Sequence, residues 1–168
     1  MKTLLVLRHA KSSWKDHGLE DHDRTLNKRG TKDAPAMGKL IRKKKLTPDW
    51  IQSSTALRAR KTAEMVAEVS KFSGEIQFEE ELYLARPATI VAVIQRSAPP
   101  SAETVLIVGH NPGFGELVEI LTGQKQLFPT AALAQIELPV ERWDELTPET
   151  EGKLIDLWRP KELAGESE

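Results

Sequence analysis

Two histidines occupy equivalent places in the sequence, each just after a run of apolar residues. His9 follows the run 3–7 and Arg8, and His110 lies two residues beyond the run 104–108. A neutral imidazole can act as a nucleophile, and a second imidazole can stabilise phosphoryl oxygens during transfer. The planar guanidinium of Arg8 matches a phosphate, which it can hold through two parallel hydrogen bonds. These residue types therefore predict chemistry on a phosphoryl group.

Arg58 offers a second guanidinium from a different part of the chain. The segment 53–58 leads from a predicted strand into a predicted helix, so Arg58 lies in that helix's first turns. A cation there opposes the helix dipole and is best tolerated beside a bound anion. Arg60 points about 200° away around the helix, so only one of the two can face the same site. Nearby arginines are expected to lower the pKa of His9, and the combined set is sufficient for phosphoryl transfer without a metal.

The elements that must position these side chains alternate between strand and helix. Strands are predicted at 3–7, 50–53, 76–78, 104–108, 131–138 and 153–158, the last two toward a sheet edge. Helices are predicted after Asn27, over about 56–72, from Pro87 to Pro99, and from Asn111 as a cap to Gly123. This alternation predicts a three-layer α/β/α sandwich around a mostly parallel sheet. Ligands of such sheets bind beyond the carboxyl ends of the strands, where these loops should meet.

Composition limits the broad class of the protein. The chain has 168 residues and a formal net charge of −1, so we expect neither nucleic acid nor a membrane surface as partner. Cysteine is absent, which suits a reducing cytoplasm. The first apolar run ends at Arg8 and is too short for a signal peptide or a membrane span. We expect one domain over 1–160 and a frayed polar tail over 161–168.

Four segments, in this order, resemble motifs of the histidine phosphatase superfamily, whose fold is phosphoglycerate mutase-like. They are residues 4–10, 23–30, 54–64 and 105–112, and the resemblance extends over nearly the whole chain. The sequence is most similar to the small SixA-type phosphohistidine phosphatase group. It shares with that group its length, the lack of a large insertion, and the Asn-Pro pair after the second histidine.

The resemblance implies roles for individual residues. His9 would be the nucleophile that becomes phosphorylated, and water would then attack phospho-His9. The resemblance also places Arg8, Arg58 and His110 at the phosphate, and it selects Arg58 rather than Arg60. Arg24 would line the pocket or support its wall, and Asn111 would assist through its backbone or side chain. The resemblance implies hydrolysis of a phosphomonoester or phosphoramidate. We expect phosphohistidine or another phosphorylated side chain as the substrate, with no metal and no cofactor.

The sequence departs from the superfamily pattern at two points. Position 10 is alanine where glycine is usual, so the turn after His9 should avoid positive φ. Many relatives carry a carboxylate proton donor between the second and third motifs, where Glu81 is the best candidate by position. A solvated acidic run before a helix is the simpler explanation of residues 79–81. The SixA-like group lacks a clear acid there. Because a phosphoramidate expels its leaving group more easily than an ester, a missing acid would favour a phosphohistidine substrate.

The polar segment between the first strand and the first helix carries three of the four histidines. A metal cluster could be imagined from Asp16, His17, Asp21, His22 and Asp23, but their spacing matches no motif with a known mechanism. We expect this segment instead to form a rim that contacts substrate, together with Lys11, Ser12 and Trp14.

Three functions remain open at this point. Only residues 59–109 separate Arg58 from His110, which leaves little room for a lid over the pocket. An open pocket favours a phosphorylated protein as partner, and a monomer is compatible with the sequence. The first alternative is a broad phosphatase or mutase acting on small phosphate esters, although a mutase needs a more closed pocket. The second is a phosphoryl-binding module without turnover.

Overall fold

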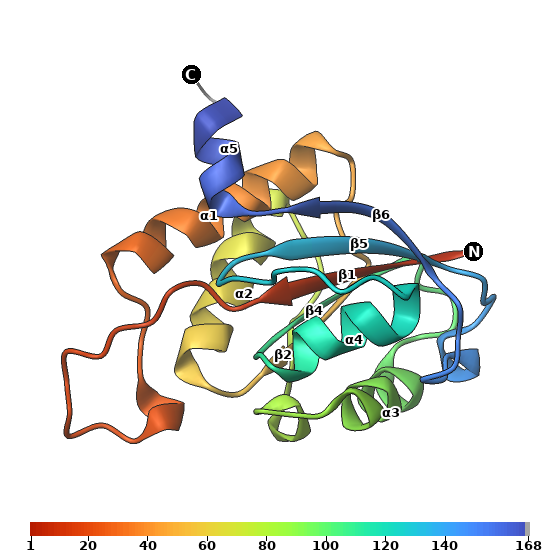
Figure 1. Cartoon of the computed structure of the whole chain (residues 1–168), viewed down its shortest axis with the longest axis horizontal. Coiled ribbons are helices and arrows are strands. Elements are labelled where there is room, and N and C mark those ends of the chain that lie inside the picture. Colours follow the sequence, from red (N-terminus) through yellow and green to blue (C-terminus); the bar gives the residue numbers. More distant parts are fainter. Residues whose placement is uncertain (167–168) are drawn as a thin grey trace.

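The computed structural model describes residues 1–166, which form one six-stranded sheet with helices on both faces (Figure 1). The strands are β1 (Lys2–Arg8), β2 (Trp50–Ser54), β3 (Gln77–Glu79), β4 (Thr104–Gly109), β5 (Leu133–Leu138) and β6 (Lys153–Trp158). The helices are α1 (Lys28–Lys43), α2 (Leu57–Ser70), α3 (Pro87–Ser97), α4 (Gly113–Thr122) and α5 (Pro160–Glu166). Three short 3₁₀ helices complete the structure: η1 (Asp21–Asp23), η2 (Glu80–Leu82) and η3 (Trp143–Glu145).

The order of the strands places the ends of β1, β2 and β4 side by side. The sheet runs β3-β2-β4-β1-β5-β6, with the first four strands parallel and the last two antiparallel. Arg8 of β1 is in register with Gly109 of β4, and Ser53 of β2 is in register with Val108. The predicted α/β sandwich with a mostly parallel sheet is therefore confirmed, and β6 lies at the sheet edge as expected.

Alternating side chains of β1 supply both halves of the core. Leu4 and Val6 pack in the cluster formed with α3 and α4, whereas Leu5 and Leu7 pack in the cluster formed with α1 and α2. A strand buried on both faces needs apolar residues at every position, which explains the unbroken run after Thr3. The two layers of helices hold the sheet in place and leave the ends of its parallel strands to form the site.

The beginning of α1 is fixed against the segment that follows β1. Asn27 caps the helix as predicted, because its side chain accepts a hydrogen bond of 2.9 Å from the backbone of Gly30. A Cβ built on Gly30 would lie 2.2 Å from the carbonyl oxygen of Lys11. Only glycine permits this close approach, which ties the polar segment to the body of the protein.

The end of the chain differs from the expected frayed tail as far as the structure describes it. Residues 160–166 form α5, and Leu163 packs against the core cluster that contains α1. Residues 167 and 168 lie outside the described part. Among residues 1–166, no helix combines the length and the apolar character needed to cross a bilayer.

Candidate functional site

The structure brings His9 and His110 together at the carboxyl ends of β1 and β4. The backbone N–H of His9 donates a hydrogen bond of 2.9 Å to the carbonyl of Gly109, and the two imidazole centroids are 5.1 Å apart. Both side chains are buried, with relative exposures of 7% for His9 and 2% for His110. The neighbouring strands thus produce the convergence that the two loops were predicted to have.

One nitrogen of His9 is occupied and defines the tautomer. Nδ1 lies 2.8 Å from the carbonyl oxygen of Ala10, and a carbonyl only accepts hydrogen bonds, so Nδ1 carries the proton. Nε2 of a neutral ring then has its lone pair available. Ala10 is not among the residues with positive φ, as its side chain predicts, and its N–H donates to Thr62 Oγ1 at 3.0 Å. Thr62 in turn donates to the carbonyl of Arg58 at 2.8 Å and so ties His9 to α2.

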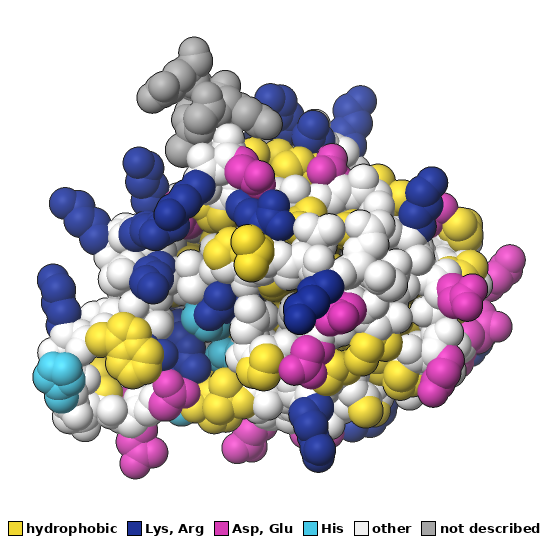
Figure 2. All heavy atoms as spheres, viewed as in Figure 1, with side chains coloured by type: hydrophobic (Ala, Val, Ile, Leu, Met, Phe, Trp, Pro, Cys, Tyr) yellow, Lys and Arg dark blue, Asp and Glu magenta, His cyan; other side chains and the backbone are white. Residues whose placement is uncertain are grey.

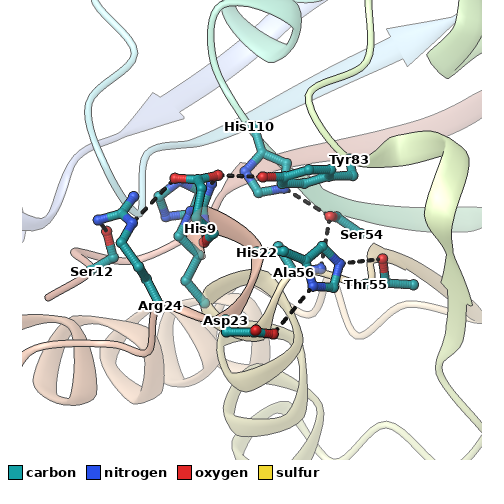
Figure 3. A network of polar contacts seen from close by, with 12 residues as sticks. His9, Ser12, His22, Asp23, Arg24, Ser54, Thr55, Ala56, Tyr83 and His110 are labelled. Carbon is teal, nitrogen blue, oxygen red and sulfur yellow. Dashed lines mark hydrogen bonds and ion pairs between the residues drawn. The ribbon is translucent and has the colours of Figure 1, made fainter. Parts of the chain in front are cut away.

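Ser54 orients His110 from the end of β2. Its Oγ lies 2.8 Å from Nε2 of His110 and accepts a hydrogen bond of 3.2 Å from the N–H of Ala56 (Figure 3). The Ser54 hydroxyl proton is therefore free to be donated to Nε2, which leaves the proton of a neutral His110 on Nδ1. Sequence reasoning did not identify Ser54, because a serine at a strand end carries no signal by itself.

Asp21 holds the guanidinium of Arg58, whose side chain is buried in the second position of α2. Arg58 Nη1 donates to the Asp21 backbone carbonyl at 2.7 Å, and Nη2 donates to Oδ2 at 2.9 Å. The same carboxylate accepts hydrogen bonds from Arg24 Nε at 3.2 Å and from the hydroxyl of Tyr83. Burial alone would raise the pKa of Asp21, but the hydrogen bonds from Tyr83 and Arg58 outweigh it and lower the pKa to about 2. The cation at the helix start thus has an anionic partner within the chain.

Three buried hydrogen-bond donors at this site have no partner. They are Nε of Arg8, Nε of Arg58 and Nδ1 of His110, which come from three different segments of the described chain. A buried donor without an acceptor costs about 1–3 kcal/mol, so such groups are uncommon unless a ligand satisfies them. All three are donors, and two belong to cations, so their natural ligand is an anion with several oxygens.

Burial keeps both histidines neutral near pH 7. It is the largest cause that lowers the pKa of His9 to about 4, against the raising effect of the Ala10 hydrogen bond and with added contributions from Arg58, Arg8 and Arg24. The pKa of His110 falls to about 3, first through burial and then through His9 and Arg58. Nearby arginines were expected to lower the pKa of His9, whereas loss of hydration is the larger cause in the structure.

Arg24 and Asn111 support the site. Arg24 is buried and donates to Ser12 Oγ at 2.9 Å (Figure 3). Its Cζ lies 3.5 Å from the ring centroid of Trp14, so it braces the polar segment. Asn111 donates from Nδ2 to the carbonyl of Phe128 at 2.7 Å and accepts from the N–H of Gly115 at 3.1 Å. Both groups of its amide are thus engaged in holding the loop and the start of α4.

Glu81, the candidate proton donor by position, fits the alternative explanation of a solvated acidic run. Its carboxylate lies 3.2 Å from Arg96 of α3, and 57% of its side chain is exposed, so it is engaged on the outer surface. Tyr83, two residues further on, turns to the site instead: its ring lies edge-on to His110 at 5.4 Å, and its hydroxyl donates to Asp21 (Figure 3). Tyr83 was not predicted from the sequence. The only sequence feature that pointed to it is its position two residues after Glu81, the candidate proton donor.

The histidines and acids of the polar segment spread out in the structure. Asp21 faces Arg58, His22 Nε2 lies 2.9 Å from Thr55 Oγ1, and Asp16 accepts a hydrogen bond from Gly18 on the exposed outer turn. Within residues 1–166, no group of three or more His, Asp or Glu side chains is placed to hold a metal ion.

Comparisons with known proteins agree with this geometry. The model of the histidine phosphatase superfamily, branch 1, matches residues 4–83. An uncharacterized chloroplastic protein of Arabidopsis thaliana is 31% identical over 152 residues, which cover 86% of this chain and 70% of that protein.

Among solved structures, one assigned as the phosphohistidine phosphatase SixA of Agrobacterium tumefaciens is 30% identical, with a TM-score of 0.80 and coverage of 95% of this chain and 98% of that one. The protein histidine phosphatase SixA in complex with tungstate shares the fold, with a TM-score of 0.81, 22% identity, and coverage of 96% and 99%.

Proposed function

The chain belongs to the histidine phosphatase superfamily and is a phosphatase-type hydrolase, and from this premise we propose that it hydrolyses phosphohistidine on a protein through a covalent phospho-His9 intermediate. The observation that carries the proposal is the set of three unpartnered buried donors on Arg8, Arg58 and His110. A phosphoryl group bound beside His9 would give each of them an oxygen to bind.

In the first step, Nε2 of His9 attacks phosphorus. The substrate's P–N bond breaks, and the leaving imidazole takes the bonding electron pair and leaves as a neutral ring that carries a proton from solvent. The donors on Arg8, Arg58 and His110 bind the three phosphoryl oxygens and stabilise their charge as it redistributes. No metal is needed in this scheme, because the arginines supply the positive charge.

In the second step, water attacks the phosphorus of phospho-His9. The P–N bond breaks, its electron pair returns to Nε2, and inorganic phosphate leaves with the oxygen and the two protons of the water. The carbonyl of Ala10, 2.8 Å from Nδ1, stabilises the positive charge that the ring carries while Nε2 is phosphorylated.

Because the chain contains no cysteine, we place this activity in the reducing cytoplasm.

The decisive test is to trap the phosphoenzyme in the presence of a chelator. Labelled phosphohistidine protein should transfer its label to the unaltered chain. His9→Ala should abolish the label and lower hydrolysis by about a thousandfold or more. The control is His17→Ala, which removes an exposed histidine of the polar segment.

Other outcomes separate the alternatives. A label that persists in His9→Ala would contradict the nucleophile, and activity lost to the chelator would contradict the metal-free scheme. Fast hydrolysis of small phosphate esters with none of phosphohistidine proteins would favour a small-molecule phosphatase. Phosphate binding without labelling by any donor would favour a binding module.

A further inference from the structure

A groove adjoins the candidate site at Arg8 and Asn111. Its volume is about 740 Å³, and the residues that matter here are Arg8, Lys11, Arg29, Leu127, Arg159 and Lys161. They come from four segments of the chain. Arg8 and Lys11 lie at the end of β1 and just after it, Arg29 lies in α1, Leu127 lies in the loop before β5, and Arg159 and Lys161 lie directly before α5 and at its start. Figure 2 shows basic side chains predominating over α1, beside the hollow in which histidine side chains are visible.

The groove carries a surplus of positive charge. Five of its lining residues are cations, and Glu162 is the one acidic residue among them. Arg159 pairs with Glu162 at 3.3 Å, and Arg29 pairs with Asp33 at 3.4 Å. Lys11 and Lys161 are exposed and lie in no ion pair with the carboxylates that the structure describes. This contrasts with the net charge of −1 for the whole chain.

The inner end of the groove is continuous with the phosphate site. Arg8 belongs to both, and its Nη1 donates to the carbonyl of Phe128 in the groove wall at 3.2 Å. Arg159 holds the neighbouring residue in the same wall, because its Nε donates to the carbonyl of Leu127 at 3.0 Å. The side chain of Leu127 remains 82% exposed at the rim. A molecule whose phosphoryl group reached His9 could therefore extend along a basic wall with an apolar edge.

We propose that this basic groove binds an acidic polypeptide segment next to the phosphorylated side chain of a protein substrate. This proposal rests on the proposed function. It adds that the substrate protein is negatively charged around its phosphorylated residue. Lys11 and Lys161, which lie in no ion pair with the carboxylates of the described residues, fit several carboxylates along a chain, and the exposed Leu127 fits an apolar side chain among them. The charge surplus would also accelerate encounter with an acidic partner at low salt.

The test uses two synthetic peptides phosphorylated on one histidine by phosphoramidate. One carries Asp and Glu on both flanks, and the other carries Asn and Gln at the same positions. The unaltered chain should prefer the acidic peptide by about tenfold in kcat/KM at low salt, and added salt should reduce this preference. The double variant Lys11→Glu, Lys161→Glu should bring the ratio to one or below. Lys153→Glu is the control, since it reverses an exposed charge at the opposite end of β6.

Binding of the same peptides without phosphate, measured by fluorescence anisotropy, tests the groove independently of turnover. The acidic peptide should bind more tightly than the neutral one, and the double variant should remove the difference. If neither phosphopeptide is hydrolysed but the acidic peptide binds through the lysines, the proposed function fails and the groove stands. Equal binding of both peptides, or a preference that survives the double variant, would overturn the groove.

Discussion

At the scale of single residues, the site depends on which polar atoms already have partners. His9 Nδ1 and His110 Nε2 are engaged by Ala10 and Ser54, so each ring presents its other nitrogen. Arg58 likewise uses both Nη groups on Asp21 and keeps Nε without a partner. Each of these side chains is thus held by one set of contacts and keeps a second polar atom without a partner among the described residues.

Because Arg58 uses its two Nη groups for Asp21 and keeps Nε without a partner, we predict that Arg58→Lys will not support hydrolysis at the normal rate. One ammonium cannot hold the Asp21 carboxylate and carbonyl and also present a separate buried donor, so we expect kcat/KM to fall by about a hundredfold. Steady-state hydrolysis of phosphohistidine protein measures this effect. Arg60→Lys is the matched control, because Arg60 is exposed and its Cζ lies 4.5 Å from the Phe78 ring centroid. Equal losses in the two variants would contradict the choice of Arg58.

At the scale of elements, the start of α4 and the turn after η2 are packed too closely to move independently. A Cβ built on Gly113 would lie 1.9 Å from the carbonyl oxygen of Ala85. Ala85 follows Tyr83 by two residues, and Gly113 follows His110 by three. This contact therefore fixes the spacing between the tyrosine and the histidine that meet edge-on in the site.

Gly113→Ala should accordingly lower both stability and activity. The new methyl group must push a backbone carbonyl aside, which costs about 1–3 kcal/mol, and the displaced turn should move Tyr83 away from His110. Urea unfolding and hydrolysis measure the two effects.

Gly115→Ala provides the comparison within the same helix. Its added Cβ would meet its nearest neighbour at 3.4 Å, an ordinary contact, and alanine favours helix by about 1 kcal/mol. We expect this variant to be as stable as the unaltered chain or more so. A stable Gly113→Ala with full activity would refute the packing argument.

At the scale of the whole molecule, the buried histidines couple folding to pH. Folding lowers the pKa of His9 from 6.5 to about 4 and that of His110 from 6.5 to about 3. Below pH 6.5 the unfolded chain therefore binds more protons than the folded one. The free energy of unfolding decreases as the pH is lowered, until the folded histidines are themselves protonated.

We expect the free energy of unfolding to decrease between about pH 6.5 and pH 4 by on the order of a few kcal/mol. Urea titrations across this range measure the slope. His110→Gln keeps an amide that can bond Ser54 but removes one titrating group, so its slope should be shallower. His17→Gln, at an exposed position, should follow the unaltered chain. Identical slopes for all three proteins would show that His110 does not drive the acid sensitivity.

The sequence alone determined the strands, the first four helices and the two histidines that follow β1 and β4. The continuous apolar runs at β1 and β4 predict buried parallel strands, because burial on both faces demands apolar side chains at every position. Polar residues directly after such strands must then lie at the edge of the sheet. Residue type and position also pointed to Arg8 and Arg58, and the ordered motifs selected Arg58 rather than Arg60.

Only the tertiary structure decided which polar side chains turn toward those residues. Asp21 reaches Arg58 from a segment without apolar periodicity, and no spacing rule predicts that contact. Glu81 and Tyr83 differ by two positions, yet one faces α3 and the other faces His110. Near a 3₁₀ turn, two residues amount to roughly 240° of rotation, so direction depends on how η2 packs. The basic groove likewise exists only because folding brings its four segments together. The composition does not reveal it, because the whole chain has nearly equal numbers of basic and acidic side chains.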